Sequence, residues 1–156
     1  MLSREALICS KRSICCLRTM SLSTSCSNGY VETARVLLRN GADPTHTADW
    51  DGGYNTPCTI SGDYWYTNSN TPLHQAARGN HAGIIDLLLN GPDKESLAFA
   101  AEKGLDLAAT WGAVKIDSKT TSADFYDDEG NEEREEMTPL GFALMFGNLD
   151  AALALI

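Results

Sequence analysis

A short string that occurs twice constrains the fold of this chain more than any other feature. Residues 71–73 read Thr-Pro-Leu, and the same three residues return at 138–140. In both places an apolar helical face follows, then a turn containing glycine or asparagine, then a second apolar stretch. Each copy therefore predicts two short antiparallel helices joined by a tight turn. A chain that repeats such a pair is expected to stack the pairs into an all-α solenoid.

The first copy, "TPLHQAARGNHAGIIDLLLNG", contains residues suited to starting and stopping helices. Thr71 is a suitable N-cap, because its hydroxyl can accept a hydrogen bond from a backbone N–H of the first turn. Pro72 suits the first helical position, where its missing N–H costs nothing. Asn80 can adopt the left-handed conformation that ends a helix. Leu73 and the alanine pair after it share one face, which allows a neighbouring helix to approach closely.

Two further segments fit the same pattern less completely. The segment "NGYVETARVLLRNGADP", residues 28–44, has the turn, the apolar run and the ending, and residues 20–27 supply its first helix with Leu22 and Cys26 on the core face. The segment "ESLAFAAEKGLDLAATWGAV", residues 95–114, lacks the Thr-Pro opening, and Pro92 is expected to start its first helix. The predicted units lie near 20–43, 71–91, 92–114 and 138–156, with insertions at 44–70 and 115–137.

The strings "TPLHQAA", "IIDLLL" and "VLLRNGADP" resemble the ankyrin repeat, whose units recur every 33 residues or so and open with Thr-Pro-Leu-His. Equivalent positions in the predicted units begin near Met20, Thr71, Glu95 and Thr138, which are 51, 24 and 43 residues apart, so the resemblance implies about four helix-turn-helix units with two long inter-repeat loops. It also implies a non-catalytic protein-interaction scaffold or adaptor, which binds another protein through loop fingers and the exposed side of the first helices.

Carried onto this sequence, the resemblance nominates partner-binding residues on the first long loop and on the helices. The loop residues are Asp49, Trp50, Asp51, Tyr64, Trp65 and Tyr66, and the helix residues are Gln75, Arg78, Phe99, Glu102, Phe142 and Met145. Two alternatives stay open. The loop aromatics can pack against one another to stiffen the loop, and the apolar helix residues can belong to the core.

The resemblance also assigns a structural role to the opening motif of each complete unit. The residues concerned are Thr71, Pro72, Leu73, His74, Thr138, Pro139 and Leu140. His74 is expected to hydrogen-bond Thr71 and nearby backbone through its ring nitrogens and so to lock the turn. A role as a base or metal ligand is the alternative. His81, in the turn between the helices, is also expected to be structural.

The second long loop is strongly acidic, because residues 115–137 contain nine carboxylates against three basic side chains. This composition suggests an ion-binding or regulatory module as the alternative function. The loop does not match a calcium-binding loop, however, since a glycine at position six would place Phe125 at position one. The five cysteines form no Cys-x-x-Cys pair. We therefore expect no metal, no cofactor and no catalytic group.

Charge and composition exclude other classes. The formal net charge is −9 and no basic stripe is present, so nucleic acid is not an expected partner. No apolar run approaches a membrane span. The odd number of irregularly spaced cysteines favours an intracellular protein, cytoplasmic or nuclear. Residues 1–19, with a net charge of +3, are expected to be disordered or a targeting segment.

The last unit ends on "AALALI", which is expected to leave Leu153, Leu155 and Ile156 poorly covered. A solenoid usually carries a polar outer face on its terminal repeats. We therefore expect further repeats or a partner to cover this end. A related alternative is that the chain is a piece of a larger ankyrin protein whose activity lies elsewhere.

Overall fold

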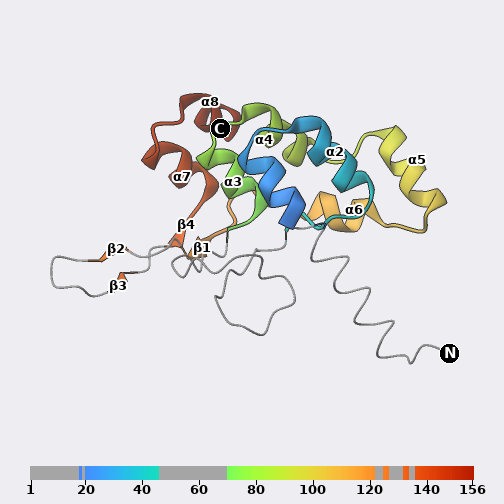
Figure 1. Ribbon diagram of the computed structural model, residues 1–156, viewed down its shortest axis with the longest axis horizontal. Coiled ribbons are helices and arrows are strands. Elements are labelled where there is room, and N and C mark those ends of the chain that lie inside the picture. Colours follow the sequence, from blue (N-terminus) through green and yellow to red (C-terminus); the bar gives the residue numbers. More distant parts are fainter. Residues whose placement is uncertain (1–17, 19, 46–69, 122–124, 127–131, 134–135) are drawn as a thin grey trace.

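The computed structural model describes residues 18, 20–45, 70–121, 125–126, 132–133 and 136–156. Its helices lie in two rows (Figure 1). In chain order the elements are a helical segment over residues 20–27, α2 (Val31–Arg39), α3 (Pro72–Arg78), α4 (Ala82–Asn90), α5 (Lys94–Glu102), α6 (Leu107–Thr110), the 3-10 helix η1 (Trp111–Ala113), α7 (Pro139–Met145) and α8 (Leu149–Ala154). The prediction of an all-α fold built from four helix pairs is confirmed.

The second long loop adds two short antiparallel strand pairs below the helices. Strand β1 (Thr120–Thr121) pairs with β4 (Glu136–Met137), and β2 (Phe125–Tyr126) pairs with β3 (Glu132–Glu133). The β1–β4 pair lies at the base of this loop, and β4 leads directly into α7. The pairing therefore holds the two ends of the loop together next to the helices.

The turn within each helix pair reverses the chain through a residue with positive φ. In the second pair this residue is Asn80, with φ 58°, as predicted. In the first pair it is Gly29, with φ 74°. A Cβ atom at Gly29 would lie 2.6 Å from Nδ1 of His81, so both the backbone angle and the neighbouring unit require glycine there.

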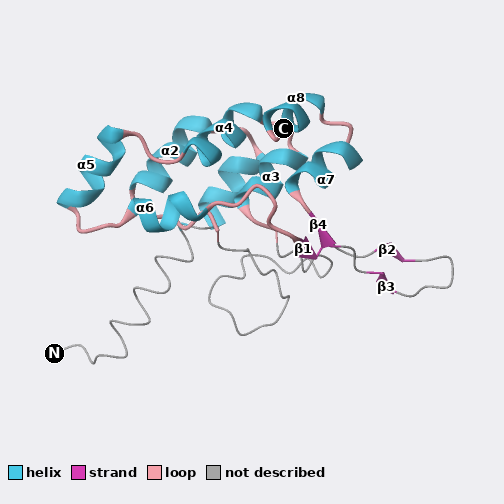
Figure 2. Ribbon diagram, turned by 180° about the vertical axis from the view of Figure 1, so that it is seen from behind, coloured by secondary structure: helices cyan, strands magenta, loops and turns pink. Residues whose placement is uncertain are grey.

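The helix pairs do not stack in chain order. Helices α3 and α4 pack directly on α7 and α8. Helix α2 packs on the opposite side of α4, and α5 packs on α2. The order along the stack is therefore the third pair, the first pair, the second pair and the fourth pair (Figures 1 and 2). Thr71 and Thr138 begin stacked neighbours although 67 residues, about two ankyrin periods, separate them.

The third pair is also turned relative to the others. Its first helix, α5, lies in the row of α2, α4 and α8, while α6 lies in the row of α3 and α7 (Figure 2). Helix α5 begins at Lys94 and not at Pro92, so the predicted start was wrong. The Asp93 carboxylate accepts a hydrogen bond from Ser96 N at 2.6 Å and is the N-cap.

Polar contacts join α5 to α2 at this boundary. The Arg39 Nε donates to Ser96 Oγ at 2.6 Å, and its Nη2 lies 3.6 Å from Asp93 Oδ1. Lys103 Nζ donates to Asn40 Oδ1 at 3.1 Å. The hydrogen bonds from Ser96 lower the pKa of Asp93 most, and the nearby arginines lower it further. Charged and polar contacts thus add to the apolar packing at the boundary between the third and first pairs.

Apolar side chains from all four pairs form one continuous core. Leu22 and Cys26 are fully buried, as predicted, and burial raises the pKa of the Cys26 thiol to about 12. Small residues occupy the tightest positions between units, where Ala76, Ala77 and Ala143 are fully buried. These buried side chains hold the two rows of helices together, so the surface available for function is the outside of the stack.

Candidate interaction surface

His74 is a buried structural residue that ties the second unit to the fourth. Its Nδ1 lies 2.8 Å from Thr71 Oγ1, and its Nε2 lies 3.1 Å from the carbonyl oxygen of Met137. A carbonyl only accepts, so Nε2 carries the proton and Nδ1 accepts from the threonine hydroxyl. Burial lowers the pKa of His74 and favours this neutral form. The predicted locking role is therefore observed, with Met137 as the backbone partner.

The two Thr-Pro-Leu motifs use their threonines differently. Thr138 Oγ1 accepts from Gly141 N at 3.2 Å and caps α7. Thr71 is the N-cap residue of α3, as predicted, but its hydroxyl makes no cap hydrogen bond, so the predicted role of that hydroxyl was wrong. The reason is the residue three positions later: His74 engages the Thr71 hydroxyl, while glycine at the equivalent Gly141 leaves the Thr138 hydroxyl free to cap.

A second contact repeats from unit to unit at the turn between paired helices. His81 Nε2 lies 3.0 Å from the carbonyl oxygen of Ser27 in the first unit. Asn148, 67 residues after His81, donates from Nδ2 to the carbonyl oxygens of Arg78 at 2.7 Å and Ala77 at 2.9 Å. The second and fourth units therefore each bind backbone carbonyls at the end of the first helix in the neighbouring unit.

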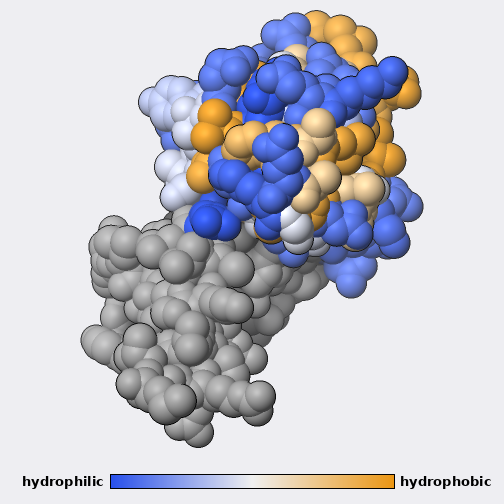
Figure 3. Space-filling model, turned by 90° about the vertical axis from the view of Figure 1, so that its right-hand side faces the viewer, coloured by the Kyte–Doolittle hydropathy of each residue, from blue (hydrophilic) through white to orange (hydrophobic). Residues whose placement is uncertain are grey.

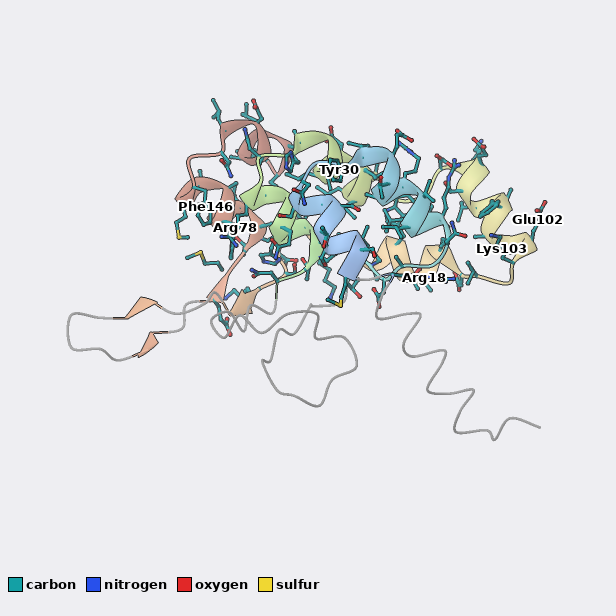
Figure 4. All side chains as sticks on the ribbon, in the orientation of Figure 1. Arg18, Tyr30, Arg78, Glu102, Lys103 and Phe146 are labelled. Atoms are coloured by element: carbon teal, nitrogen blue, oxygen red, sulfur yellow. The ribbon has the colours of Figure 1, made fainter. Side chains whose placement is uncertain are left out.

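These contacts leave one mixed apolar and basic surface where α3 and α7 lie side by side. The Arg78 guanidinium carbon lies 5.4 Å from the centroid of the Phe146 ring, a cation–π distance (Figure 4). Met145 beside it is 44% exposed. Gln75, one turn before Arg78, is half-buried. We call Gln75, Arg78, Met145 and Phe146 the helix-face patch.

The structure divides the predicted helix residues among three places. Gln75, Arg78 and Met145 come together in the helix-face patch. Phe99 and Glu102 lie on α5, at the other end of the stack and in the other row, where Lys103 Nζ lies 4.2 Å from the Phe99 ring centroid (Figure 4). They do not share a surface with the patch because the third pair is turned and out of order.

Phe142 is the exception, because it belongs to the core and not to the surface. Its side chain is only 4% exposed, and its ring meets His74 edge-on with centroids 5.4 Å apart. The nomination of Phe142 as a partner contact is corrected for this reason. Phe142 instead packs the fourth unit against the histidine of the second.

The predicted loop residues Asp49, Trp50, Asp51, Tyr64, Trp65 and Tyr66 lie outside the described residues, as do residues 122–124, 127–131 and 134–135 of the acidic loop. Within the described part of the chain, no group of histidine, cysteine or acidic side chains is arranged to hold a metal ion. Among the described helices, none is long and apolar enough to cross a membrane.

Sequence reasoning overlooked several exposed apolar residues of the last unit. Leu144, Phe146 and Leu149 are 65%, 46% and 68% exposed. Leu153 and Ile156 are exposed as predicted, whereas Leu155 is buried because it turns inward at the end of α8. A comparison of the two complete units position by position, with an offset of 67 residues, would have identified Leu144, Phe146 and Leu149.

Comparison with known proteins agrees with this architecture. The family model described as "Ankyrin repeats (3 copies)" matches residues 22–156, which is most of the chain. No curated protein matches the sequence significantly. The Thr-Pro-Leu-His motif, the paired helices and the inter-unit contacts at the turns are all consistent with that match. The chain belongs to the ankyrin repeat family.

Proposed function

We propose that this chain is a non-catalytic scaffold or adaptor that binds another protein. Ankyrin repeat domains are generally protein-interaction modules, and the proposal applies that role to the helix-face patch and to the predicted aromatic loop. The observation that carries it is the exposed pairing of Arg78 with Phe146 across two neighbouring units, beside the half-exposed Met145.

The chemistry of the patch suits a protein partner. Arginine, aromatic residues and methionine are the side chains most enriched in protein interfaces and at their energetic centres. The Arg78 guanidinium already lies against an aromatic ring, so its orientation is partly fixed before a partner arrives. The inward position of Phe142 supports this arrangement, because it packs α7 beside α3.

Capture from a lysate, with quantitative mass spectrometry, tests the proposal. The wild type is compared with a helix-face variant, Arg78→Ser with Met145→Ser, and with a loop variant, Trp50→Ser, Tyr64→Ser and Trp65→Ser. The matched control is Val36→Ser, because Val36 is 56% exposed on α2 in the opposite row. Circular dichroism must show equal helicity in all four proteins.

A protein captured by the wild type and the control but lost from the helix-face variant supports the patch. Loss from the loop variant alone transfers the binding site to the first insertion. If all four proteins capture the same set, neither surface binds a partner and the proposal fails.

The acidic loop supplies the one specific reason for a second candidate, an ion-binding regulatory role. Nine carboxylates lie within residues 115–137, and the β1–β4 pair closes the base of this segment. Calcium titration by calorimetry compares the intact chain with a chain lacking residues 117–136. Heat from the intact chain alone favours the ion-binding role, and no heat from either leaves protein binding as the better explanation.

A further inference from the structure

The outer unit of the stack, α7 and α8, carries an unusually apolar surface. The exposed residues, which we call the end-unit face, are Leu144, Phe146, Leu149, Leu153 and Ile156, with exposed fractions of 65%, 46%, 68%, 63% and 91%. Leu149 and Leu153 are four residues apart on α8 and so lie on one side of that helix. Single exposed leucines are ordinary, but this number on one short unit is not.

The equivalent positions in the second unit show what is distinctive about this face. At the offset of 67 residues, Leu144 corresponds to Ala77, Phe146 to Gly79, Leu149 to Ala82 and Leu153 to Asp86. Every one of these positions carries a small or charged residue in the second unit and a large apolar residue in the fourth. At these four positions the end-unit face is larger and more apolar than the second unit, whereas Ile156 corresponds to Leu89, which is also apolar.

The enlargement disfavours a further repeat stacked in the same geometry. Ala77 is fully buried where the fourth unit stacks on the second, and Asn148 reaches its carbonyl oxygen at 2.9 Å. Leu144 at the equivalent place adds a branched side chain and would hold a following helix further away. The face therefore fits an apolar surface of different shape from a repeated unit.

We propose that the end-unit face binds a second copy of this chain in a two-fold symmetric dimer. A two-fold interface pairs the same surface with itself, and such dimers are the commonest protein oligomers. The chain carries a net charge of −9, but Asp150 is the only charged residue between Thr138 and Ile156. Self-pairing at this face therefore brings together the least charged part of an acidic molecule.

The charges at the rim of the face are compatible with this pairing. Asp150 accepts a hydrogen bond from Asn80 Nδ2 at 3.3 Å, and the nearby Arg78 has the opposite sign. The opposite end of the stack differs, because exposed Lys94, Glu95, Glu102 and Lys103 lie on α5. Figure 3 shows hydrophilic and hydrophobic residues mixed on that end, where α5 also exposes Leu97 and Phe99. A head-to-tail contact would therefore set the apolar face against a mixed surface, whereas a two-fold contact pairs two surfaces that carry almost no charge.

The area of the face can be compared with the apolar part of a standard dimer interface. Full burial of a large aliphatic side chain removes about 120 Å² of apolar surface from water, so the five exposed side chains offer about 400 Å² per copy. A standard interface covers about 800 Å² per partner, of which about 65% is apolar in homodimers. The five side chains thus supply most of the apolar area of such an interface.

Sedimentation velocity of the full chain tests the proposal, over about 5–200 μM protein and in a reducing buffer because the chain has five cysteines. The main variant is Leu144→Ala with Leu149→Ala, which installs the alanines found at the equivalent positions of the second unit. A second variant, Leu149→Glu, sets two carboxylates against each other across the two-fold axis. The control is Val36→Ala, which truncates another exposed aliphatic side chain far from the face.

The wild type and the control are expected to reach twice the 16.9 kDa mass of one chain as concentration rises. Both face variants should remain near one mass, with a dissociation constant at least about tenfold higher. A wild type that stays monomeric throughout overturns the proposal and leaves the face to another partner. Dimerisation unchanged in both variants, or growth beyond a dimer, overturns it as well. Phe146 belongs to both the end-unit face and the helix-face patch, and for this reason both variants leave Phe146, Arg78 and Met145 unchanged.

Discussion

Replacing His74 with alanine is expected to destabilise the protein by about 2–4 kcal/mol. The change removes the bond from Nε2 to the Met137 carbonyl, the bond to Thr71 and the edge-on contact with Phe142. These contacts join the second unit to the fourth, so their loss acts on the stack and not on one helix alone.

The magnitude follows from what remains after the change. Thr138, which has no histidine after it, uses its hydroxyl to cap α7 through Gly141 N. Thr71 can do the same for α3 once the histidine is gone, so its hydroxyl need not stay unpaired. The Met137 carbonyl loses its bond to the histidine, and because Met137 is only half-buried this loss costs about 1–2 kcal/mol. The space beside Phe142 adds about 1–2 kcal/mol.

Urea unfolding at pH 8, followed by circular dichroism, measures this difference. The control is Gln75→Ala, because Gln75 is the neighbouring half-buried residue of α3 and should change stability by less than about 0.5 kcal/mol. A Thr71→Val variant, alone and combined with His74→Ala, measures the coupling between the two side chains. If His74→Ala costs less than about 1 kcal/mol, or no more than the control, the argument for a histidine lock is refuted.

Three further predictions follow from other contacts. Burial lowers the pKa of His74 below 6.5, so the contribution of neutral His74 to the free energy of unfolding should be complete above pH 6.5 and should decline as the pH falls further. The difference in the free energy of unfolding between the wild type and His74→Ala should therefore become smaller at low pH. Asn148→Ala should cost about 1–2 kcal/mol in urea unfolding, whereas Asn148→His should be tolerated because His81 makes the same contact one unit earlier. Arg39→Ala should speed hydrogen exchange in α5 and α6 but not in α3, and 0.5 M salt should reproduce part of this effect in the wild type, because ion pairs contribute to this boundary. Equal exchange rates in the Arg39 variant and the wild type would contradict the account of the boundary.

The features that were predicted correctly from the sequence depend on residues that are close together along the chain. The helix pair at 71–91 follows from apolar spacing, Pro72 and the left-handed Asn80, all within one short segment. The role of His74 was also predicted, because the motif that carries it is local. Thr71 was assigned the wrong partner, because capping and the histidine bond compete for one hydroxyl and only the fold decides between them.

The stacking order could not be predicted, because spacing along the chain does not determine which unit packs on which. The segment Gly91–Asp93 links α4 to α5 with three residues, which span at most about 11 Å. In the other units a long loop returns the chain to the row that contains the first helices α3 and α7. Three residues are too short for such a return. Asp93 meets Arg35 and Arg39 of α2 at 3.6 Å, which places α5 beside α2.

The altered order decides which surfaces are available for binding. Because α5 lies beyond α2, the residues Phe99 and Glu102 face solvent at one end of the stack, far from the patch around Arg78. Because α7 packs directly on α3, Arg78 and Phe146 meet across a boundary that sequential stacking would have filled with the third pair. The proposed helix-face patch therefore arises from units that are neighbours in space and not in sequence.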